Sequence, residues 1–132
     1  LHEDEEFTPR VFLAATEIYV SDLCFYQYNR REQSITNRKD LYQNVHDLYE
    51  NLKELDCLYD MEQEPLRSAL KESLLEKYLY MYAKANVCEK RYDAIRNKAF
   101  VKGKSRSWKN RIKVLLFTVN DTWYCNISRK KG

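Results

Sequence analysis

Residues that break helices or form tight turns are nearly absent from this chain. Its 132 residues include only two glycines and two prolines. Antiparallel sandwiches and barrels need many tight turns, and those turns usually need Gly, Pro, Asn or Asp. So few breakers favour a small number of long helices joined by short connections. At this length we expect one domain, residues 1–132, with a single core.

The spacing of apolar residues predicts the two clearest helices. Over residues 36–61 the apolar positions recur at alternate intervals of four and three, with acids and amides between them, which is typical of an amphipathic helix. The members of this stripe are Leu41, Val45, Leu48, Leu52, Leu55 and Tyr59. A second stripe predicts a helix that opens at Pro65 and weakens beyond Asn86. Its members are Leu66, Leu70, Leu74, Tyr78, Met81 and Ala85.

Two further helices are predicted on weaker patterns. Residues 1–8 form an acidic tail, and Thr8 and Pro9 then indicate the N-cap and first turn of a helix that runs to about residue 31. This helix is apolar on most sides, which is typical of a buried element. Residues 88–100 are expected to form a shorter helix. Its inward residues are Tyr92, Ile95 and Phe100.

The last helix follows the clearest break in the chain, residues 101–107, where Ser105 or Ser107 can act as the N-cap. It is expected to end near Tyr124, before a basic tail over residues 126–132. One side carries Trp108, Ile112, Leu115, Leu116, Val119 and Trp123. We expect the aliphatic members of this side to face the core. Residues 114–119 could also form a strand, but no second strand candidate exists. The predicted fold is therefore all-α, an up-and-down bundle of four to five helices.

Residue patterns that carry catalysis are scarce. The chain has two histidines, of which His2 lies in the acidic tail and His46 on the polar side of the second predicted helix. No nucleophile elbow, zinc-protease motif or glycine-rich phosphate loop occurs. Glu72 and Glu76 stand four residues apart next to lysines, which favours a solvated ion-pair face over paired catalytic carboxylates. We expect a protein that is not an enzyme and binds no metal or cofactor.

Charge is divided between the two halves of the chain. Residues 1–65 contain 15 acids and 6 bases, a net charge of −9, whereas residues 66–132 contain 17 bases and 5 acids, a net charge of +12. A basic surface attracts phosphate, anionic lipid or acidic protein. Nucleic acid is a poor candidate, because the acidic half would repel it and no nucleic-acid-binding motif is present.

The basic half also has more large apolar residues than one helix face can bury. A cationic segment with exposed Trp and Phe is typical of a protein that binds the membrane surface. The predicted membrane-binding residues are Lys98, Lys102, Lys104, Arg106, Trp108, Lys109, Arg111, Lys113, Phe117, Trp123, Tyr124, Lys130 and Lys131. The expected partner is an anionic phospholipid membrane. No run of residues is apolar and long enough to span a bilayer.

Four widely spaced cysteines are candidates for disulfides. Cys24, Cys57, Cys88 and Cys125 contain no C-x-x-C pair, so a zinc site is not expected. Two disulfides would allow three connectivities, and buried free thiols are the alternative. The chain begins at Leu1 rather than Met and contains two N-glycosylation sequons, at Asn120 and Asn126, which favour a mature secreted protein.

Two segments resemble the abalone sperm lysin family. Residues 7–15, FTPRVFLAA, resemble the start of the first lysin helix, and residues 34–42, SITNRKDLY, resemble the start of its second helix. The length, helix order and aromatic richness are also similar. Lysin is basic throughout and lacks this cysteine set, and these departures suit the diverged eighteen-kilodalton branch of sperm acrosomal proteins.

The resemblance implies a five-helix bundle that is stored in the sperm acrosome and released at fertilisation. Lysin opens the egg envelope without cleaving it, and the eighteen-kilodalton branch is thought to promote fusion of sperm and egg membranes. The resemblance therefore implies a secreted, non-enzymatic fusion protein acting on the egg plasma membrane. A lysin-like egg-envelope binder and a helical cytokine remain alternatives, and an egg-surface receptor and a homodimer remain open as partners.

Overall fold

The computed structural model describes residues 3–24, 27 and 41–129 of the chain. Its α-helices are α1 (Glu3–Ala14), α2 (Tyr42–Tyr59), α3 (Leu66–Lys84), α4 (Trp108–Val119) and α5 (Asp121–Arg129). A short 3-10 helix, η2 (Lys90–Tyr92), lies between α3 and α4. None of the described residues belongs to a strand, so the predicted all-α class is confirmed, as is the helical assignment of residues 114–119.

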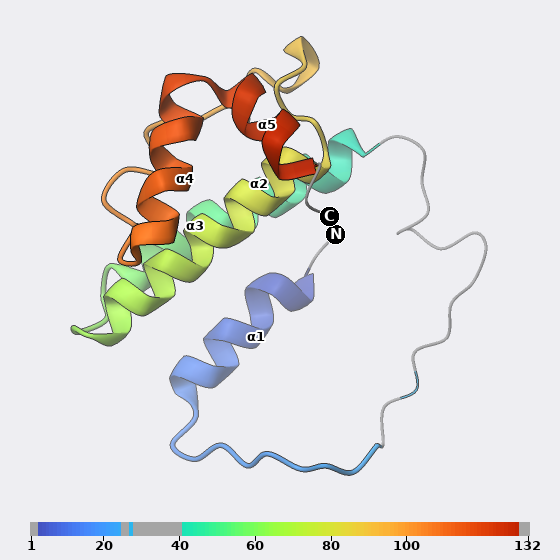
Figure 1. Cartoon of the computed structure of the whole chain (residues 1–132). Coiled ribbons are helices and arrows are strands. Elements are labelled where there is room, and N and C mark those ends of the chain that lie inside the picture. The colour runs from blue at the N-terminus through green and yellow to red at the C-terminus, as the bar shows by residue number, and fades with distance from the viewer. Residues whose placement is uncertain (1–2, 25–26, 28–40, 130–132) are drawn as a thin grey trace.

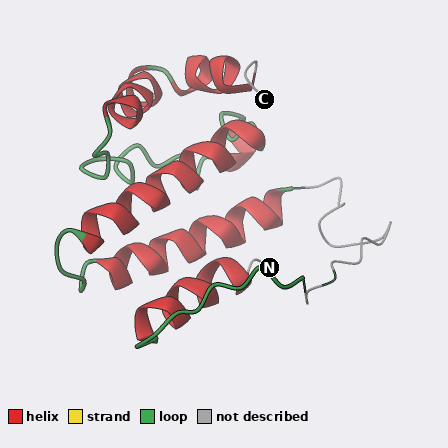
Figure 2. Ribbon diagram, turned by 60° about the horizontal axis from the view of Figure 1, so that its bottom comes forward, coloured by secondary structure: helices red, strands yellow, loops and turns green. Residues whose placement is uncertain are grey.

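The helices are arranged around α3 (Figure 1). α2 and α3 run antiparallel, while α1 lies along α2 and runs in the same direction as α2 (Figure 2). α4 and α5 cover the opposite side of α3. Two ion pairs fix α1: Glu5 pairs with Lys77 of α3, and Arg10 lies 3.6 Å from Glu54 of α2. The central helix α3 therefore separates the acidic α1–α2 side from α4 and α5.

The apolar stripes predicted for α2 and α3 form most of the core. The buried members on α2 are Val45, Tyr49, Leu52, Leu55 and Tyr59, and those on α3 include Leu74, Leu75, Tyr78, Leu79 and Tyr82. Aromatic rings then join α3 to α4 and α5, since Phe117 contacts Tyr82 edge-on at 4.7 Å and Tyr124 at 5.8 Å between ring centroids. Such edge-to-face pairs add to the stability that burial alone provides.

The first helix differs from its prediction in both ends. It begins at Glu3, within the predicted acidic tail, because the acids Asp4, Glu5 and Glu6 in the first turn interact favourably with the helix dipole. It ends at Ala14 instead of continuing to about residue 31. The described part that follows, residues 15–24, contains β-branched residues at 16, 18 and 20 and has no helical structure. Its apolar side chains, including Ile18 and Val20, are exposed rather than buried.

Asparagine side chains explain two other differences. Residues 88–100 form turns around η2 instead of one helix, and the Asn97 side chain accepts hydrogen bonds from the N–H groups of Ala99 and Phe100, an alternative to helical bonding. The inward positions Tyr92, Ile95 and Phe100 are nevertheless buried, as predicted. The last predicted helix is divided at Asn120, whose Oδ1 accepts the Trp123 N–H and caps α5. Of the predicted 36–61 helix, residues 36–40 lie outside the described residues.

Candidate functional site

The solvent-facing side of α4 is apolar. Trp108, Ile112, Leu115 and Val119 follow one another at helical intervals, and their exposed fractions are 68%, 48%, 63% and 73%. Side chains at such intervals lie on one face of a helix. On the opposite face of α4, Phe117 is fully buried against α3. α4 is therefore apolar on two sides, of which only one is covered by the bundle.

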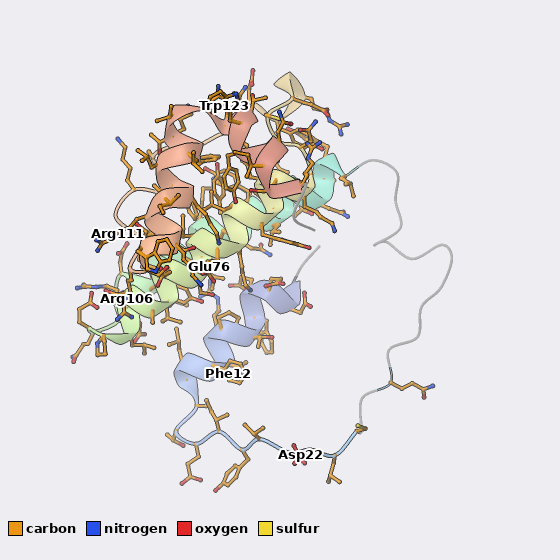
Figure 3. The ribbon with its side chains drawn as sticks, in the orientation of Figure 1. Phe12, Asp22, Glu76, Arg106, Arg111 and Trp123 are labelled. Carbon is orange, nitrogen blue, oxygen red and sulfur yellow. The ribbon has the colours of Figure 1, made fainter. Side chains whose placement is uncertain are left out.

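α5 also exposes apolar side chains. Trp123 and Ile127, four residues apart on α5, are 63% and 44% exposed. We call the six side chains together the outer face: Trp108, Ile112, Leu115, Val119, Trp123 and Ile127. Figure 3 shows Trp123 and Arg111 at the periphery of α5 and α4, well away from Phe12 on α1. A run of exposed apolar side chains along two helices is a feature that marks protein or membrane contact sites.

The N-terminus of α4 is fixed by a carboxylate from α3. Oε1 of Glu72 accepts hydrogen bonds from the N–H groups of Arg106 and Ser107, at 3.0 and 2.8 Å. The Ser107 side chain also caps α4 by accepting the Asn110 N–H, which confirms one of its two predicted caps. These hydrogen bonds lower the pKa of the Glu72 carboxyl from 4.5 to about 2, and the bond from the Ser107 N–H has the largest effect. α4 is thus held to α3 by an ionised cap.

A buried asparagine completes this junction. Asn110 is 1% exposed, and its Nδ2 donates to Glu72 at 2.9 Å and to Glu76 at 2.7 Å. The prediction that Glu72 and Glu76 form a solvated ion-pair face was wrong, because both carboxylates bind α4. The neighbouring lysines have other partners: Lys71 pairs with Asp56 and Asp60, and Lys77 pairs with Glu5. The sequence indicated this contact only through Asn110, a polar residue on the side of α4 opposite its exposed apolar stripe.

A second polar cluster fixes α5. Asp121 is 6% exposed and accepts hydrogen bonds from Tyr82 Oη at 2.6 Å and from Arg96 Nη2 at 2.8 Å. Burial raises the pKa of Asp121, but the bonds from Tyr82 and Arg96 outweigh it and hold the pKa below its ordinary value. Sequence reasoning missed this cluster, although Asn120-Asp121 has the composition of a helix N-terminus. The cluster determines which side of α5 faces outward.

The predicted cationic residues divide into several groups. Lys109, Arg111 and Lys113 are exposed on α4, and Lys102 and Arg106 are exposed in the segment before it. In the part of the chain that the structure describes, no ion pair is recorded for Lys109, Arg111 or Lys113. Lys109 and Arg111 carry positive charge along the two edges of the apolar stripe, and we call these two side chains the flanking cations. Lys113 lies further round α4, towards α3, where it lines a pocket with Glu76 and Leu79.

Two other predicted cations are engaged elsewhere. Lys104 is only 11% exposed at its side chain, pairs with Asp56 at 2.9 Å, and lies over the Phe100 ring. The prediction that Lys104 binds the membrane surface was therefore wrong. Lys98 is exposed but donates to the carbonyl of Thr118 at 2.9 Å. Lys130 and Lys131 lie outside the described residues.

The aromatic predictions divide in a similar way. Trp108 and Trp123 are exposed, whereas Phe117 and Tyr124 are buried in the core and cannot contact a membrane from there. The aliphatic residues expected inside, Ile112, Leu115 and Val119, instead lie outside. α4 is thus rotated from its predicted orientation, because Asn110 and Phe117 fit the carboxylates and rings that α3 presents. Tyr124 Oη donates to the carbonyl of Leu79, which satisfies its hydroxyl in the core.

The four cysteines occupy three kinds of environment. Cys24 and Cys57 are exposed, Cys88 is half-buried and Cys125 is buried, and the structure holds all four as thiols. Within the described residues no group of three metal-ligating side chains is found. His46 lies 3.8 Å from Asp47 on α2, and no nucleophile accompanies the pair among the contacts described. None of the helices in the described residues has the length and apolar character to cross a membrane.

Comparison of the chain with protein-family models, curated proteins and solved structures finds no match. The resemblance to the lysin family therefore remains a prediction from the sequence. The outer face and the flanking cations are the features of the structure that carry a functional argument.

Proposed function

We propose that this protein binds anionic membranes through the outer face of α4 and α5. Following the lysin resemblance, we further propose that it is a secreted protein of the sperm acrosomal vesicle that promotes fusion of sperm and egg membranes without an enzymatic step. The observation that supports the first proposal is the exposed apolar stripe with cations along its edges. The resemblance alone supports the setting of fertilisation and the fusion step.

The outer face offers enough apolar surface for membrane association. Full burial of a large apolar side chain contributes about 1.5–3 kcal/mol. The six outer-face side chains are between 44% and 73% exposed. Burial of the surface that is still exposed would therefore contribute about 1 kcal/mol for each side chain, or about 6 kcal/mol together. A single myristoyl chain, by comparison, gives marginal binding with an association constant of about 10⁴ M⁻¹. The apolar stripe is therefore comparable to one lipid anchor before the charges are counted.

The flanking cations favour an anionic surface over a neutral one. Each Lys or Arg near an acidic bilayer contributes about 1 kcal/mol, and the contribution falls within a Debye length as salt increases. Lys109 and Arg111 together would contribute about 2 kcal/mol at low salt. A symmetric dimer through the outer face would instead place the cations of two copies close together, which is unfavourable. The charges thus favour lipid over a second copy as the partner of this face.

The two tryptophans allow a direct test without a label. The chain contains only Trp108 and Trp123, and both belong to the outer face. Insertion into the headgroup region should shift their emission to shorter wavelength. We expect this shift with vesicles that contain phosphatidylserine, a smaller shift at high salt, and little shift with phosphatidylcholine alone. An unchanged spectrum with both vesicle types would refute membrane binding through this face.

A matched pair of variants locates the binding surface. Leu115→Ser removes an apolar side chain from the outer face, and Phe12→Ser removes one of similar exposure from α1. We expect Leu115→Ser to weaken vesicle binding by about fivefold, because it loses about 1 kcal/mol of apolar burial. Phe12→Ser should bind as the wild type does. Lipid-mixing assays on the same samples distinguish fusion from adhesion, and equal effects of both variants would contradict the proposed face.

A further inference from the structure

Two cysteines from distant parts of the chain meet at the end of α3. Cys125 is fully buried on α5, and its Sγ lies 3.8 Å from the carbonyl oxygen of Tyr82. The same oxygen accepts the N–H of Val87 at 3.1 Å, which places the adjoining Cys88 beside α5. After burial, the neighbouring Cys88 is a further cause of the raised pKa of Cys125. The fold therefore brings together two of the four cysteines.

The backbones on both sides of this contact are fixed. Asn86 takes a left-handed conformation, with φ of 55°, that ends α3, and its Oδ1 accepts the Cys88 thiol at 2.9 Å. On α5, Arg129 Nε donates to the carbonyl of Ala83 at 3.1 Å. These hydrogen bonds fix both segments against the end of α3, so Cys88 and Cys125 are held at the same end of the bundle.

We propose that Cys88 and Cys125 form an intramolecular disulfide, while Cys24 and Cys57 stay accessible as thiols. Of the three connectivities open from the sequence, two would separate Cys88 from Cys125. Cys57 lies exposed on α2 and Cys24 lies exposed in the segment after α1, and no contact between them is recorded in the described residues. The bond would close residues 88–125 into a loop that contains the whole of α4.

The oxidant required is a small disulfide, such as oxidised glutathione. The Cys88 thiolate attacks one glutathione sulfur, which forms a mixed disulfide and releases one glutathione. The Cys125 thiolate then attacks Sγ of Cys88 and releases the second glutathione. The protein loses two electrons and two protons, and both are recovered in the two glutathione thiols. Burial, and then the neighbouring Cys88, raise the pKa of Cys125 to about 12, so the half-buried Cys88 reacts first.

This disulfide would join the outer face to the core. α5 carries Trp123 and Ile127 of the outer face, and Cys125 lies between them on the inner side. A covalent bond to the end of α3 restricts the unfolded chain and limits opening of α4 and α5 away from the bundle. The proposal does not depend on membrane binding, because the fold places both cysteines at the end of α3 whatever the outer face binds.

Peptide mapping of the full chain tests the pairing directly. The protein is equilibrated with oxidised and reduced glutathione, treated with N-ethylmaleimide and digested with trypsin without reduction. We expect ANVCEK, residues 85–90, linked to VLLFTVNDTWYCNISR, residues 114–129. Cys24 and Cys57 should carry the maleimide. Linkage of Cys88 to any other cysteine, or maleimide on both Cys88 and Cys125, would overturn the proposal.

Thermal unfolding provides a second, independent measurement. Reduction of the wild type should lower its midpoint by about 15 °C, as expected for a disulfide that closes a loop of this length. The double variant Cys24→Ala/Cys57→Ala should keep the full dependence on reductant. Cys88→Ala should lose it and unfold at the midpoint of the reduced wild type. A wild type whose midpoint is the same with and without reductant would contradict the proposed bond.

Discussion

Replacement of Glu72 by glutamine tests how the outer face is held in position. Glu72 lies on α3 and accepts hydrogen bonds from two backbone N–H groups at the start of α4 and from the buried side chain of Asn110. Glutamine has nearly the same shape but carries no charge. The variant Glu72→Gln therefore removes the ionised cap while it leaves an oxygen acceptor in place.

The pKa of Glu72 gives the size of the effect. A pKa lowered from 4.5 to about 2 corresponds to about 3 kcal/mol in favour of the charged carboxylate. Solvent screening at this partly exposed side chain reduces that figure, and the remaining neutral acceptor recovers a further part, so we expect a loss of about 2 kcal/mol. For a chain of this length such a loss lowers the unfolding midpoint by about 8 °C at neutral pH.

The same pKa predicts how stability depends on pH. A carboxyl whose folded pKa lies below its unfolded value stabilises the fold above the unfolded value, and this stability is lost as pH falls through the folded pKa. The stability that ionised Glu72 contributes should be lost as the pH falls from about 4.5 to about 2. The free energies of unfolding of the wild type and Glu72→Gln should therefore differ most at neutral pH and converge towards pH 2.

Urea unfolding followed by circular dichroism at several pH values measures both quantities. Glu54→Gln is the matched control, because Glu54 lies on α2 with 63% of its side chain exposed and only a 3.6 Å contact with Arg10. We expect this control to stay within about 0.5 kcal/mol of the wild type. A Glu72→Gln variant as stable as the control, or a difference from wild type that does not narrow in acid, would refute the role assigned to Glu72.

Three further predictions concern the core and the charged edge of the outer face. Asp121→Ala should cost about 3–5 kcal/mol, measured by urea unfolding, because it leaves Arg96 without its buried partner and removes the acceptor of Tyr82. Phe117→Ala should cost about 3–5 kcal/mol in the same assay, because it leaves a cavity between the rings of Tyr82 and its neighbours. Arg111→Gln should weaken sedimentation with phosphatidylserine vesicles by about fivefold at low salt, and the difference should vanish at high salt. An equal loss at both salt concentrations would contradict an electrostatic role for Arg111.

The helices of the first half show what local patterns predict well. Most of the α2 and α3 stripes is buried as their spacing predicts, because the two helices pack together and each has one clearly apolar side. The first member of each stripe, Leu41 or Leu66, is exposed. The first helix was predicted less well. Its apolar residues continue past Ala14, but Ile18 and Val20 have no surface to cover and stay exposed. Periodicity and composition therefore predict a buried helix only where a partner exists.

The exposed Trp108 and Trp123 were predicted from the sequence, but the aliphatic residues of the outer face were expected in the core, because α4 has apolar residues on two sides. The larger stripe, from Trp108 to Val119, favours burial by spacing alone, yet Phe117 on the other side is the residue that enters the core. The choice depends on Glu72 and Glu76, which lie more than 30 residues away and bind Asn110. The spacing of residues identifies the two apolar sides of α4, but it does not identify the residues of α3 that determine which side is buried.

The sequence by itself determined the all-α class, the two central helices and the concentration of positive charge in the second half, since these depend on residue type and local spacing. The tertiary structure decided which side of α4 faces solvent, where α5 begins and which cysteines meet. Those features depend on contacts between segments far apart in the chain, such as Tyr82 with Asp121. Free energies of burial and hydrogen bonding at such contacts exceed the local preferences that the sequence displays.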